Sequence, residues 1–408
     1  MTGRRPARRL SQQGPVVYLH VGEPKSGTTF LQDVLWGNRA TLARQGVVLP
    51  GLHPQDHYRA SQDLCEVAQP HDDPSGSWAG EWELLARQAL DADAVAVISH
   101  ELFAAATAEQ AARAITSLDA AEVHVVLTVR DFVSLLPAEW QETVKHRNTG
   151  RWQRWVRRLI RTETAERPKG TPWFWRVHDT LGVLRRWSQA VPPDRVHVVT
   201  VPPTGSPPDL LWRRFASVLG VDADSADLST ARPNTSLGLA EAELLRRLNV
   251  ALRKSNSDGV PDWYYAVHVK ERIAHDMLAS RPAAQRPRLK PRQEQWARGR
   301  AEKVVAGLQE SGYDIVGALD DLLPASGPPR ARSGMVPPQA VLDAAVDVLA
   351  ARIRADYQGR KSGADAGEAT AARVKRWVRN ASTRSASVRR LRMFAWRWTE
   401  RVRARRDS

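Results

Sequence analysis

The strongest constraint on the fold is a short apolar run that ends in a glycine-containing loop and continues into a helix pattern. Val16–Val21 leads into Gly22-Glu23-Pro24-Lys25-Ser26-Gly27-Thr28-Thr29, and apolar residues then recur at helical spacing from Phe30 to Leu35. A strand that turns through glycines into a helix presents free backbone N–H groups and the positive end of a helix dipole. The segment therefore predicts an oxyanion site at the start of an α/β domain.

The alternation of strand and helix patterns continues through the first half of the chain. Further strands are predicted at Val47–Leu49, Ala94–Ser99, Val123–Val129 and Arg195–Val201. Helices are predicted at Thr28–Trp36, Glu81–Leu90, Thr107–Ser117, Leu135–Arg147, Thr180–Ala190, Pro208–Leu219, Glu241–Arg253, Asp262–Ala279 and Pro338–Tyr357. This order favours an α/β fold with a doubly wound, mainly parallel sheet and flanking helices, followed by a C-terminal helical extension.

The expected domain organisation follows from composition along the chain. Residues 1–14 form a basic N-terminal arm and residues 15–324 the α/β domain. Residues 325–334, which contain a Pro-Pro pair and a glycine, are expected to be a linker. Residues 335–408 are expected to be a helical extension that ends in a basic amphipathic segment.

Charge and cysteine content restrict the function classes. The chain has 60 Lys and Arg against 45 Asp and Glu, a net charge of +15. Residues 371–408 account for eleven of these charges and residues 1–10 for four, so the rest is formally neutral and a whole-domain nucleic-acid surface is not expected. The single cysteine, Cys65, and the lack of a long apolar run or a signal-peptide pattern predict a cytoplasmic protein.

The loop differs in one informative way from the nucleotide-binding pattern G-x-x-x-x-G-K-[ST]. Gly22 and Gly27 keep the glycine spacing, but Thr28 stands where the lysine is expected and Lys25 lies inside the loop. Pro24-Lys25-Ser26-Gly27-Thr28-Thr29 resembles the 5′-phosphosulfate loop of sulfotransferases that use 3′-phosphoadenylyl sulfate (PAPS). The resemblance implies that Pro24, Lys25, Ser26, Gly27, Thr28 and Thr29 bind this co-substrate, with Lys25 neutralising the leaving phosphate oxygen and no metal required.

A second similarity follows the strand Val123–Val129. In sulfotransferases an arginine at the end of such a strand, and a serine eight residues later, hold the 3′-phosphate. Arg130 occupies the arginine position, but the eighth residue is Ala138 and the nearest hydroxyl belongs to Ser134. An ion pair between Arg130 and Asp131 is the alternative interpretation.

Three further segments resemble bacterial members of this superfamily, so the similarity covers about residues 15–324. They are Trp140–His146, Arg232–Gly238 and Gly312–Gly317. In the first segment, Gln141 and Lys145 lie one turn apart and either face a ligand together or form a solvated polar face.

Transfer of a sulfuryl group to a hydroxyl requires a base, and the strand Ala94–Ser99 delivers His100 and Glu101 to the edge of the sheet where doubly wound folds bind ligands. His100 is the first choice, because cytosolic sulfotransferases have a similar histidine, and Glu101 is the alternative. A packing or capping role for His100 is the competing interpretation. His53 and His57 form a second loop candidate, although a solvated loop is the favoured interpretation of both.

The acceptor is expected to be a hydroxyl compound, namely a carbohydrate, a glycolipid or a small metabolite. The fifteen tryptophans are expected mainly in the core, and the basic stripe within residues 371–408 is typical of a helix that binds an anionic membrane surface or an acidic acceptor, unless that segment is a solvated tail. Two other functions stay open: a P-loop kinase or NTPase, and a non-catalytic nucleotide- or polyanion-binding protein.

Overall fold

The computed structural model describes residues 14–67, 78–92, 94–163, 172–231, 236–254, 259–281, 285–324 and 336–362. Its centre is one six-stranded sheet in which every pair of neighbouring strands is parallel. The strands are β1 (Val16–His20), β2 (Val47–Val48), β3 (Val95–Ser99), β4 (Glu122–Val129), β5 (Val196–Thr200) and β6 (Asp314–Val316). The predicted doubly wound α/β fold is confirmed. The five predicted strands all form, and β6 is a further strand that was not predicted.

The strand order β2-β3-β1-β4-β5-β6 places the first strand in the interior of the sheet. The chain leaves β1 toward β2 and β3 on one side and later adds β4, β5 and β6 on the other. The winding direction therefore reverses around β1, and the loops after β3, β1 and β4 emerge side by side at the carboxyl edge. In folds of this kind that edge is where ligands bind.

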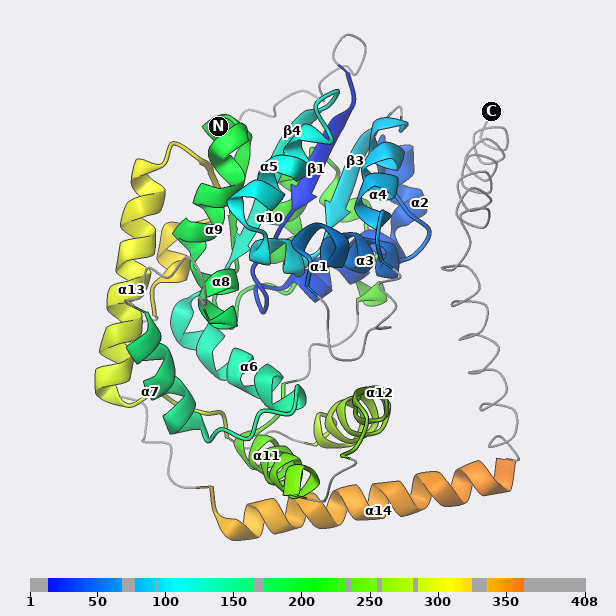
Figure 1. The fold of residues 1–408 in the computed structure, drawn as a ribbon, viewed down its shortest axis with the longest axis vertical. Helices are drawn as coiled ribbons and strands as arrows, with labels where there is room; N and C mark the ends of the chain where they lie inside the picture. The colour runs from blue at the N-terminus through cyan, green and yellow to red at the C-terminus, as the bar shows by residue number, and fades with distance from the viewer. Residues whose placement is uncertain are drawn as a thin grey trace.

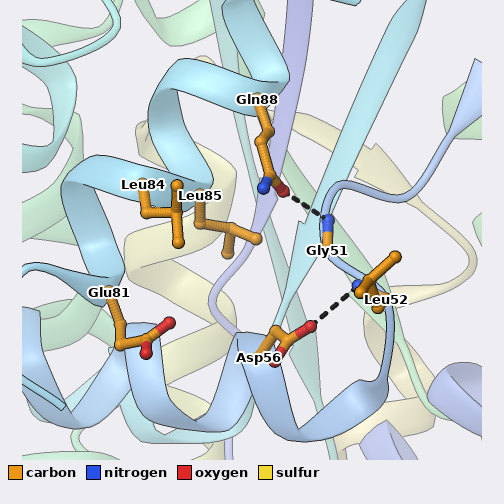
Figure 2. Close-up of a pocket in the computed structure, with 7 residues that line it drawn as sticks. All are labelled: Gly51, Leu52, Asp56, Glu81, Leu84, Leu85 and Gln88. Carbon is orange, nitrogen blue, oxygen red and sulfur yellow. Dashed lines mark hydrogen bonds between the residues drawn. The ribbon is translucent and has the colours of Figure 1, made fainter. Parts of the chain in front are cut away.

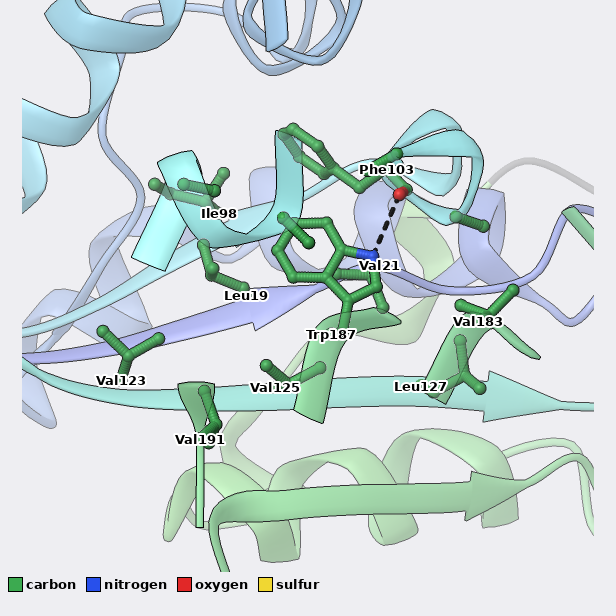
Figure 3. Close-up of a cluster of buried hydrophobic side chains, with 14 of the residues drawn as sticks. Leu19, Val21, Ile98, Phe103, Val123, Val125, Leu127, Val183, Trp187 and Val191 are labelled. Atoms are coloured by element: carbon green, nitrogen blue, oxygen red, sulfur yellow. Dashed lines mark hydrogen bonds between the residues drawn. The ribbon is translucent and has the colours of Figure 1, made fainter. Parts of the chain in front are cut away.

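Two apolar clusters cover the two faces of the sheet, as strand alternation requires. One contains Leu19, Ile98 and Leu127 with residues of the helices α3 (Pro54–Cys65), α4 (Glu81–Leu90), α5 (Ala108–Thr116) and α9 (Thr180–Trp187). The other contains Val97, Val126 and Val199 with residues of the helices α1 (Thr28–Gly37), α2 (Arg39–Arg44) and α10 (Leu210–Leu219). Figure 3 shows part of the first cluster, where the Trp187 indole N–H donates to the carbonyl of Phe103 over 3.1 Å. Both faces of the sheet are thus shielded from solvent, which explains why the strand sequences are continuous runs rich in valine.

The helices that flank the sheet and form the adjoining layer have the following bounds: α1 (Thr28–Gly37), α2 (Arg39–Arg44), α3 (Pro54–Cys65), α4 (Glu81–Leu90), η1 (Glu101–Ala105), α5 (Ala108–Thr116), α6 (Phe132–Lys145), α7 (Trp152–Thr162), α8 (Trp173–His178), α9 (Thr180–Trp187), η2 (Ser188–Ala190), η3 (Pro193–Arg195), α10 (Leu210–Leu219), η4 (Ala223–Ser225), η5 (Leu228–Thr230), α11 (Leu239–Lys254), α12 (Asp262–Tyr265), η6 (Ala266–Leu278), α13 (Pro291–Glu310), η7 (Leu319–Leu322) and α14 (Pro338–Ser362). Every predicted helix is present with its ends shifted by a few residues. The segment predicted at Asp262–Ala279 continues from α12 into η6, which is a π-helix.

A third apolar cluster joins α6, α7, α8, α11, η6, α13 and α14 beyond the carboxyl ends of the strands (Figure 1). Most tryptophans of the Arg151–Trp187 segment lie in the core as predicted, including Trp152, Trp155 and Trp175 in this cluster. Helix α14 packs on α11 and η6, so the start of the expected C-terminal extension belongs to this layer. The predicted linker, the basic arm before Gly14 and the basic segment 371–408 lie outside the described residues. Among the described helices, none is long and apolar enough to cross a membrane.

Candidate functional site

The loop between β1 and α1 combines three left-handed backbone positions within six residues. Gly22, Lys25 and Gly27 have φ values of +30°, +64° and +84°. A Cβ on Gly27 would lie 2.4 Å from Cδ2 of Leu211, so both the dihedral and the close approach of α10 require glycine there. Lys25 also has a left-handed backbone conformation, although it carries a Cβ atom that makes this conformation unfavourable. Backbone strain of this kind concentrates at functional sites.

The hydroxyl of Ser26 serves the loop itself. It donates to the Glu23 carbonyl over 2.5 Å and lies 2.6 Å from the Thr128 hydroxyl on β4, and Ser26 is fully buried. Among the predicted co-substrate residues, Ser26 thus turns its side chain inward. Thr28 is also buried, whereas Thr29 is exposed and Pro24 and Gly27 are half-buried.

A buried histidine at the end of β1 links the strands on either side of it. His20 bridges the Ser99 hydroxyl on β3, 2.7 Å from Nδ1, and the Thr128 hydroxyl on β4, 3.2 Å from Nε2. Burial lowers its pKa to about 4, so the ring is neutral at physiological pH. His20 therefore ties together the three strands whose loops form the site.

Lys25 points toward α6, where its Nζ donates to Oε2 of Glu142 over 2.8 Å. Burial alone would lower the pKa of Lys25, but the attraction of Glu142 outweighs it and raises the pKa. The same carboxylate lies 3.6 Å from Nζ of Lys145, 3.9 Å from Nζ of Lys270 and 3.2 Å from Nε2 of His146. Three ammonium groups thus surround a single carboxylate beside the loop.

The expectation of a solvated face at Gln141 and Lys145 is wrong. Both side chains are buried, because the helical layer formed by α11 and η6 covers this part of α6. Gln141 donates to the Leu237 carbonyl over 2.6 Å, and Lys145 faces Glu142. Only Lys145 therefore lies near the loop. The segment around Arg232–Thr235 falls outside the described residues.

Arg130 follows β4 and reaches back to the loop, with Nη1 3.4 Å from the carbonyl of Lys25. Asp131 instead accepts from the backbone N–H of Ser134 and caps α6. Arg130 forms no ion pair with any described carboxylate. Burial lowers its pKa, the attraction of Asp131 opposes this shift, and repulsion from Arg286 adds to it. This half-buried guanidinium therefore has a backbone carbonyl, and no described carboxylate, as its hydrogen-bond partner.

Ser134 and Ala138 lie one turn apart on α6, and both are half-buried. The backbone of Ser134 is engaged by Asp131, whereas no hydrogen bond of its hydroxyl is found among the described residues. Ser134 therefore lies on α6 four residues after Arg130, and its hydroxyl is available to a ligand as far as the described residues show.

His100 caps the 3-10 helix η1 with Nδ1, which accepts the backbone N–H of Leu102 over 3.2 Å. The Ser61 hydroxyl lies 3.2 Å from the same nitrogen. Since Nδ1 accepts a hydrogen bond, the neutral ring carries its proton on Nε2. Burial lowers the pKa of His100, which favours this neutral state.

Glu101 accepts a hydrogen bond of 3.0 Å from the Gln32 amide on α1. Burial by itself would raise its pKa, but His100, the Gln32 hydrogen bond and Lys25 together lower it. Glu101 is therefore a carboxylate within the electrostatic reach of Lys25. The structure brings Lys25, Arg130, His100 and Glu101 to adjacent strand ends, as the sequence predicted.

The predicted solvated loop at His53 and His57 is wrong for His57. Both residues belong to the start of α3, where exposed His53 is the N-cap and buried His57 lies 2.8 Å from the Pro50 carbonyl and accepts the backbone N–H of Ser99. Figure 2 shows the neighbouring turn, in which Gly51 and Leu52 donate to Gln88 and Asp56. The hollow there has a volume of about 10 Å³, which suits one water molecule and no larger ligand.

A second buried carboxylate lies in the loop itself. Glu23 accepts a 2.6 Å hydrogen bond from the Thr180 hydroxyl, and burial raises its pKa to about 7 despite the opposing charge of His178. Nearby, His178 and Glu139 approach within 3.5 Å without a well-formed hydrogen bond. The loop therefore contains a buried carboxyl group, that of Glu23, whose charge changes near neutral pH.

Sequence reasoning missed Glu142, Lys270 and Glu23. Glu142 lies in the Trp140–His146 segment that resembled bacterial sulfotransferases, but only the turn of α6 reveals that it faces Lys25. Lys270 comes from η6, more than a hundred residues away, and no local pattern marks it.

The fold and these contacts define a doubly wound α/β protein with a cationic, strained loop at the reversal point of its sheet. No family model matches the chain, and comparisons with curated proteins and with solved structures return no significant match.

Proposed function

We propose that the protein is a PAPS-dependent sulfotransferase that moves a sulfuryl group to the hydroxyl of a carbohydrate, a glycolipid or a small metabolite. The observation that carries this proposal is Arg130, a half-buried guanidinium without a carboxylate partner in the described chain, directed at the carbonyl of Lys25. The Arg130 guanidinium thus lies against the backbone of the loop that leads into α1, and Lys25 in that loop supplies a second cation directed toward α6. A ligand with two separated anionic groups, such as PAPS, suits this arrangement.

In the proposed complex, the backbone amides of Lys25, Gly27, Thr28 and Thr29 bind the 5′-phosphosulfate, since that of Ser26 already donates to the Glu23 carbonyl over 3.3 Å. Arg130 binds the 3′-phosphate, assisted by the Ser134 hydroxyl. The buried Ser26 hydroxyl and His20 keep the loop in shape and do not touch the ligand. The donor would replace Glu142 as the partner of Lys25.

The proposed reaction is an in-line displacement at sulfur. The acceptor oxygen forms a bond to sulfur while the bond between sulfur and the bridging oxygen of the 5′-phosphate breaks. Negative charge develops on that bridging oxygen, and Lys25 Nζ stabilises it. The hydroxyl proton passes to a carboxylate.

Glu101 is the better candidate for that carboxylate. His100 Nδ1 accepts the Leu102 N–H, so Nε2 of the neutral ring carries the proton and can only donate a hydrogen bond. Glu101 has one oxygen engaged by Gln32 and is negatively charged. In this proposal His100 orients the acceptor or caps η1, and Glu101 is the general base.

The deciding experiment is a calorimetric titration of wild type and Arg130→Ala with adenosine 3′,5′-bisphosphate without metal, and with ATP plus Mg²⁺. Binding of the bisphosphate that needs no Mg²⁺ and weakens at least tenfold in Arg130→Ala supports the proposal. An Arg185→Ala variant, changed on α9, serves as the control for net charge. Preference for ATP with Mg²⁺ would replace the proposal by a kinase or NTPase. Tight bisphosphate binding without sulfuryl transfer to any hydroxyl acceptor would favour a non-catalytic binding protein.

A further inference from the structure

Helix α7 carries a row of exposed arginines that the proposed reaction does not use. The row consists of Arg151, Arg154, Arg157, Arg158 and Arg161, and all five side chains are exposed. At 100° per residue they occupy about 120° of the helix circumference. The opposite face, formed by Trp152, Trp155, Val156 and Leu159, is buried in the apolar layer.

None of these five arginines forms an ion pair in the described part of the chain. Many other arginines do, for example Arg213 with Asp209 and Arg300 with Glu163. Helix α7 itself contains no acidic residue, so neighbouring turns repel one another. Five exposed arginines thus lie side by side on one helix, and no described carboxylate balances their charge, so an external anion can do so.

A hollow adjoins the first turns of the row. It has a volume of about 640 Å³ and is lined by Thr149, Gly150, Arg151, Gln153, Arg154, Arg157 and Arg246. Arg246 is already engaged, because Glu243 accepts from its Nε and Nη2 and the Thr149 carbonyl from its Nη1. The guanidinium groups at the hollow without a described carboxylate partner are therefore those of Arg151, Arg154 and Arg157, and Arg157 also donates from Nε to the Gln153 carbonyl over 3.2 Å.

One uncharged polar side chain also lines the hollow. Gln153 donates its amide to the Arg288 carbonyl over 3.3 Å, while its Oε1 is buried without a partner among the described residues. The hollow is therefore lined by guanidinium groups together with a polar amide.

We propose that the α7 arginine row and its hollow bind a linear acidic polysaccharide. From Arg151 to Arg161 the row extends about 15 Å along the helix axis, so it matches anions repeated along a chain better than a single anion. Guanidinium forks bind sulfate and carboxylate in pairs of hydrogen bonds. Gln153, Thr149 and Gly150 line the same hollow beside the arginines.

Two other polyanions fit less well. A membrane-binding helix needs exposed apolar residues, but those of α7 are buried. Single-stranded nucleic acid is normally held by aromatic stacking as well as by charge, and the exposed face of α7 has no aromatic residue.

The test measures binding of fluorescent octasaccharides to the full chain and to Arg154→Gln/Arg157→Gln/Arg158→Gln. One octasaccharide is heparin-derived, with sulfates and carboxylates, and the other is an oligogalacturonate with carboxylates alone. The charge-matched control is Arg87→Gln/Arg185→Gln/Arg292→Gln, in which the changed arginines lie on α4, α9 and α13. Both triple variants keep residues 371–408, so the basic tail contributes equally.

We expect the α7 variant to bind at least one octasaccharide roughly tenfold or more weakly, with a salt dependence reduced by two to three ions, and the control to stay within about twofold. Its unfolding temperature should not fall, because no ion pair is lost. Arg154→Lys/Arg157→Lys/Arg158→Lys should bind at an intermediate level, since it keeps the charge without the fork.

Three results would overturn the proposal. One is equal weakening in the α7 and control variants, and another is the absence of saturable binding to both saccharides. The third is stronger, α7-dependent binding of a single-stranded DNA octamer or of phosphatidylglycerol vesicles. Because these measurements need no PAPS, their failure leaves the proposed sulfotransferase function untouched.

Discussion

Nζ of Lys25 lies 2.8 Å from Oε2 of Glu142, so the only cation inside the loop is held by a carboxylate of α6. Two further lysines, Lys145 and Lys270, approach the same carboxylate. The arrangement makes Glu142 an internal anion at the position proposed for the donor. Binding of the donor and the ion pair are then mutually exclusive at Lys25.

Removal of this internal competitor should strengthen donor binding. We expect Glu142→Gln to unfold at a lower temperature, because three ammonium groups lose their common partner. The same variant should bind adenosine 3′,5′-bisphosphate roughly 3- to 30-fold more tightly and gain more thermal stability from it than wild type. Calorimetry and thermal unfolding measure both effects, with Glu294→Gln on the exposed face of α13 as the control. Unchanged or weaker bisphosphate binding would show that Lys25 does not exchange Glu142 for the donor.

Lys25 itself should be needed for turnover but not for folding. Lys25→Ala is expected to lower the release of bisphosphate from PAPS by two or more orders of magnitude, because the leaving oxygen loses its cation. Circular dichroism should show a folded protein, and Lys303→Ala on α13 should behave as wild type. Full activity of Lys25→Ala would rule out its role at the leaving group.

The two base candidates are separable by substitutions that keep their hydrogen bonds. An asparagine at position 100 can still accept the Leu102 N–H, so His100→Asn should retain most turnover if the ring only caps η1 or orients the acceptor. Glu101→Gln should lose roughly 10²- to 10⁴-fold in turnover with bisphosphate binding intact. If His100→Asn instead lost far more turnover than Glu101→Gln, His100 would be the general base.

The buried carboxyl of Glu23 should make stability depend on pH. Its pKa is raised from 4.5 to about 7, so the folded state binds the proton more strongly than the unfolded chain. The protonated form is fully favourable below about pH 4.5, and this stabilisation is lost as the pH rises to 7. Glu23→Gln should therefore stabilise the protein at pH 8 by roughly 3 kcal/mol and have little effect at pH 4.5. Urea unfolding at the two pH values measures the difference, and exposed Glu310→Gln should show none.

The loop glycine offers a matched pair of substitutions. Gly27 and Gly80 have nearly the same φ, +84° and +82°, but only a Cβ at position 27 would meet another side chain, Leu211. Gly80→Ala should cost about 1–2 kcal/mol through its dihedral alone, and Gly27→Ala a further 1–3 kcal/mol through the contact. Adding Leu211→Ala should recover part of the second cost. Equal destabilisation by the two glycine substitutions would mean that α10 does not constrain the loop.

The sequence alone determined the sheet and the position of the loop, because these depend on local patterns. Val16–Val21 followed by Gly22–Gly27 defines a strand, a turn and a helix within twenty residues, and parallel strands necessarily deliver Lys25, His100 and Arg130 to one edge. Residue type and spacing suffice for such statements. They do not specify which way a side chain turns.

Tertiary packing decided the partners of those residues. Ser26 turns inward because Thr128 of β4 lies beneath it, and His100 becomes a capping acceptor because η1 starts at the next residue. Lys25 meets Glu142 only because α6 folds back over the loop, and Lys270 joins them from η6, which is distant in sequence. These contacts arise from helices that pack through apolar faces. Their charged side chains are brought together as a consequence, and no local sequence pattern encodes that meeting.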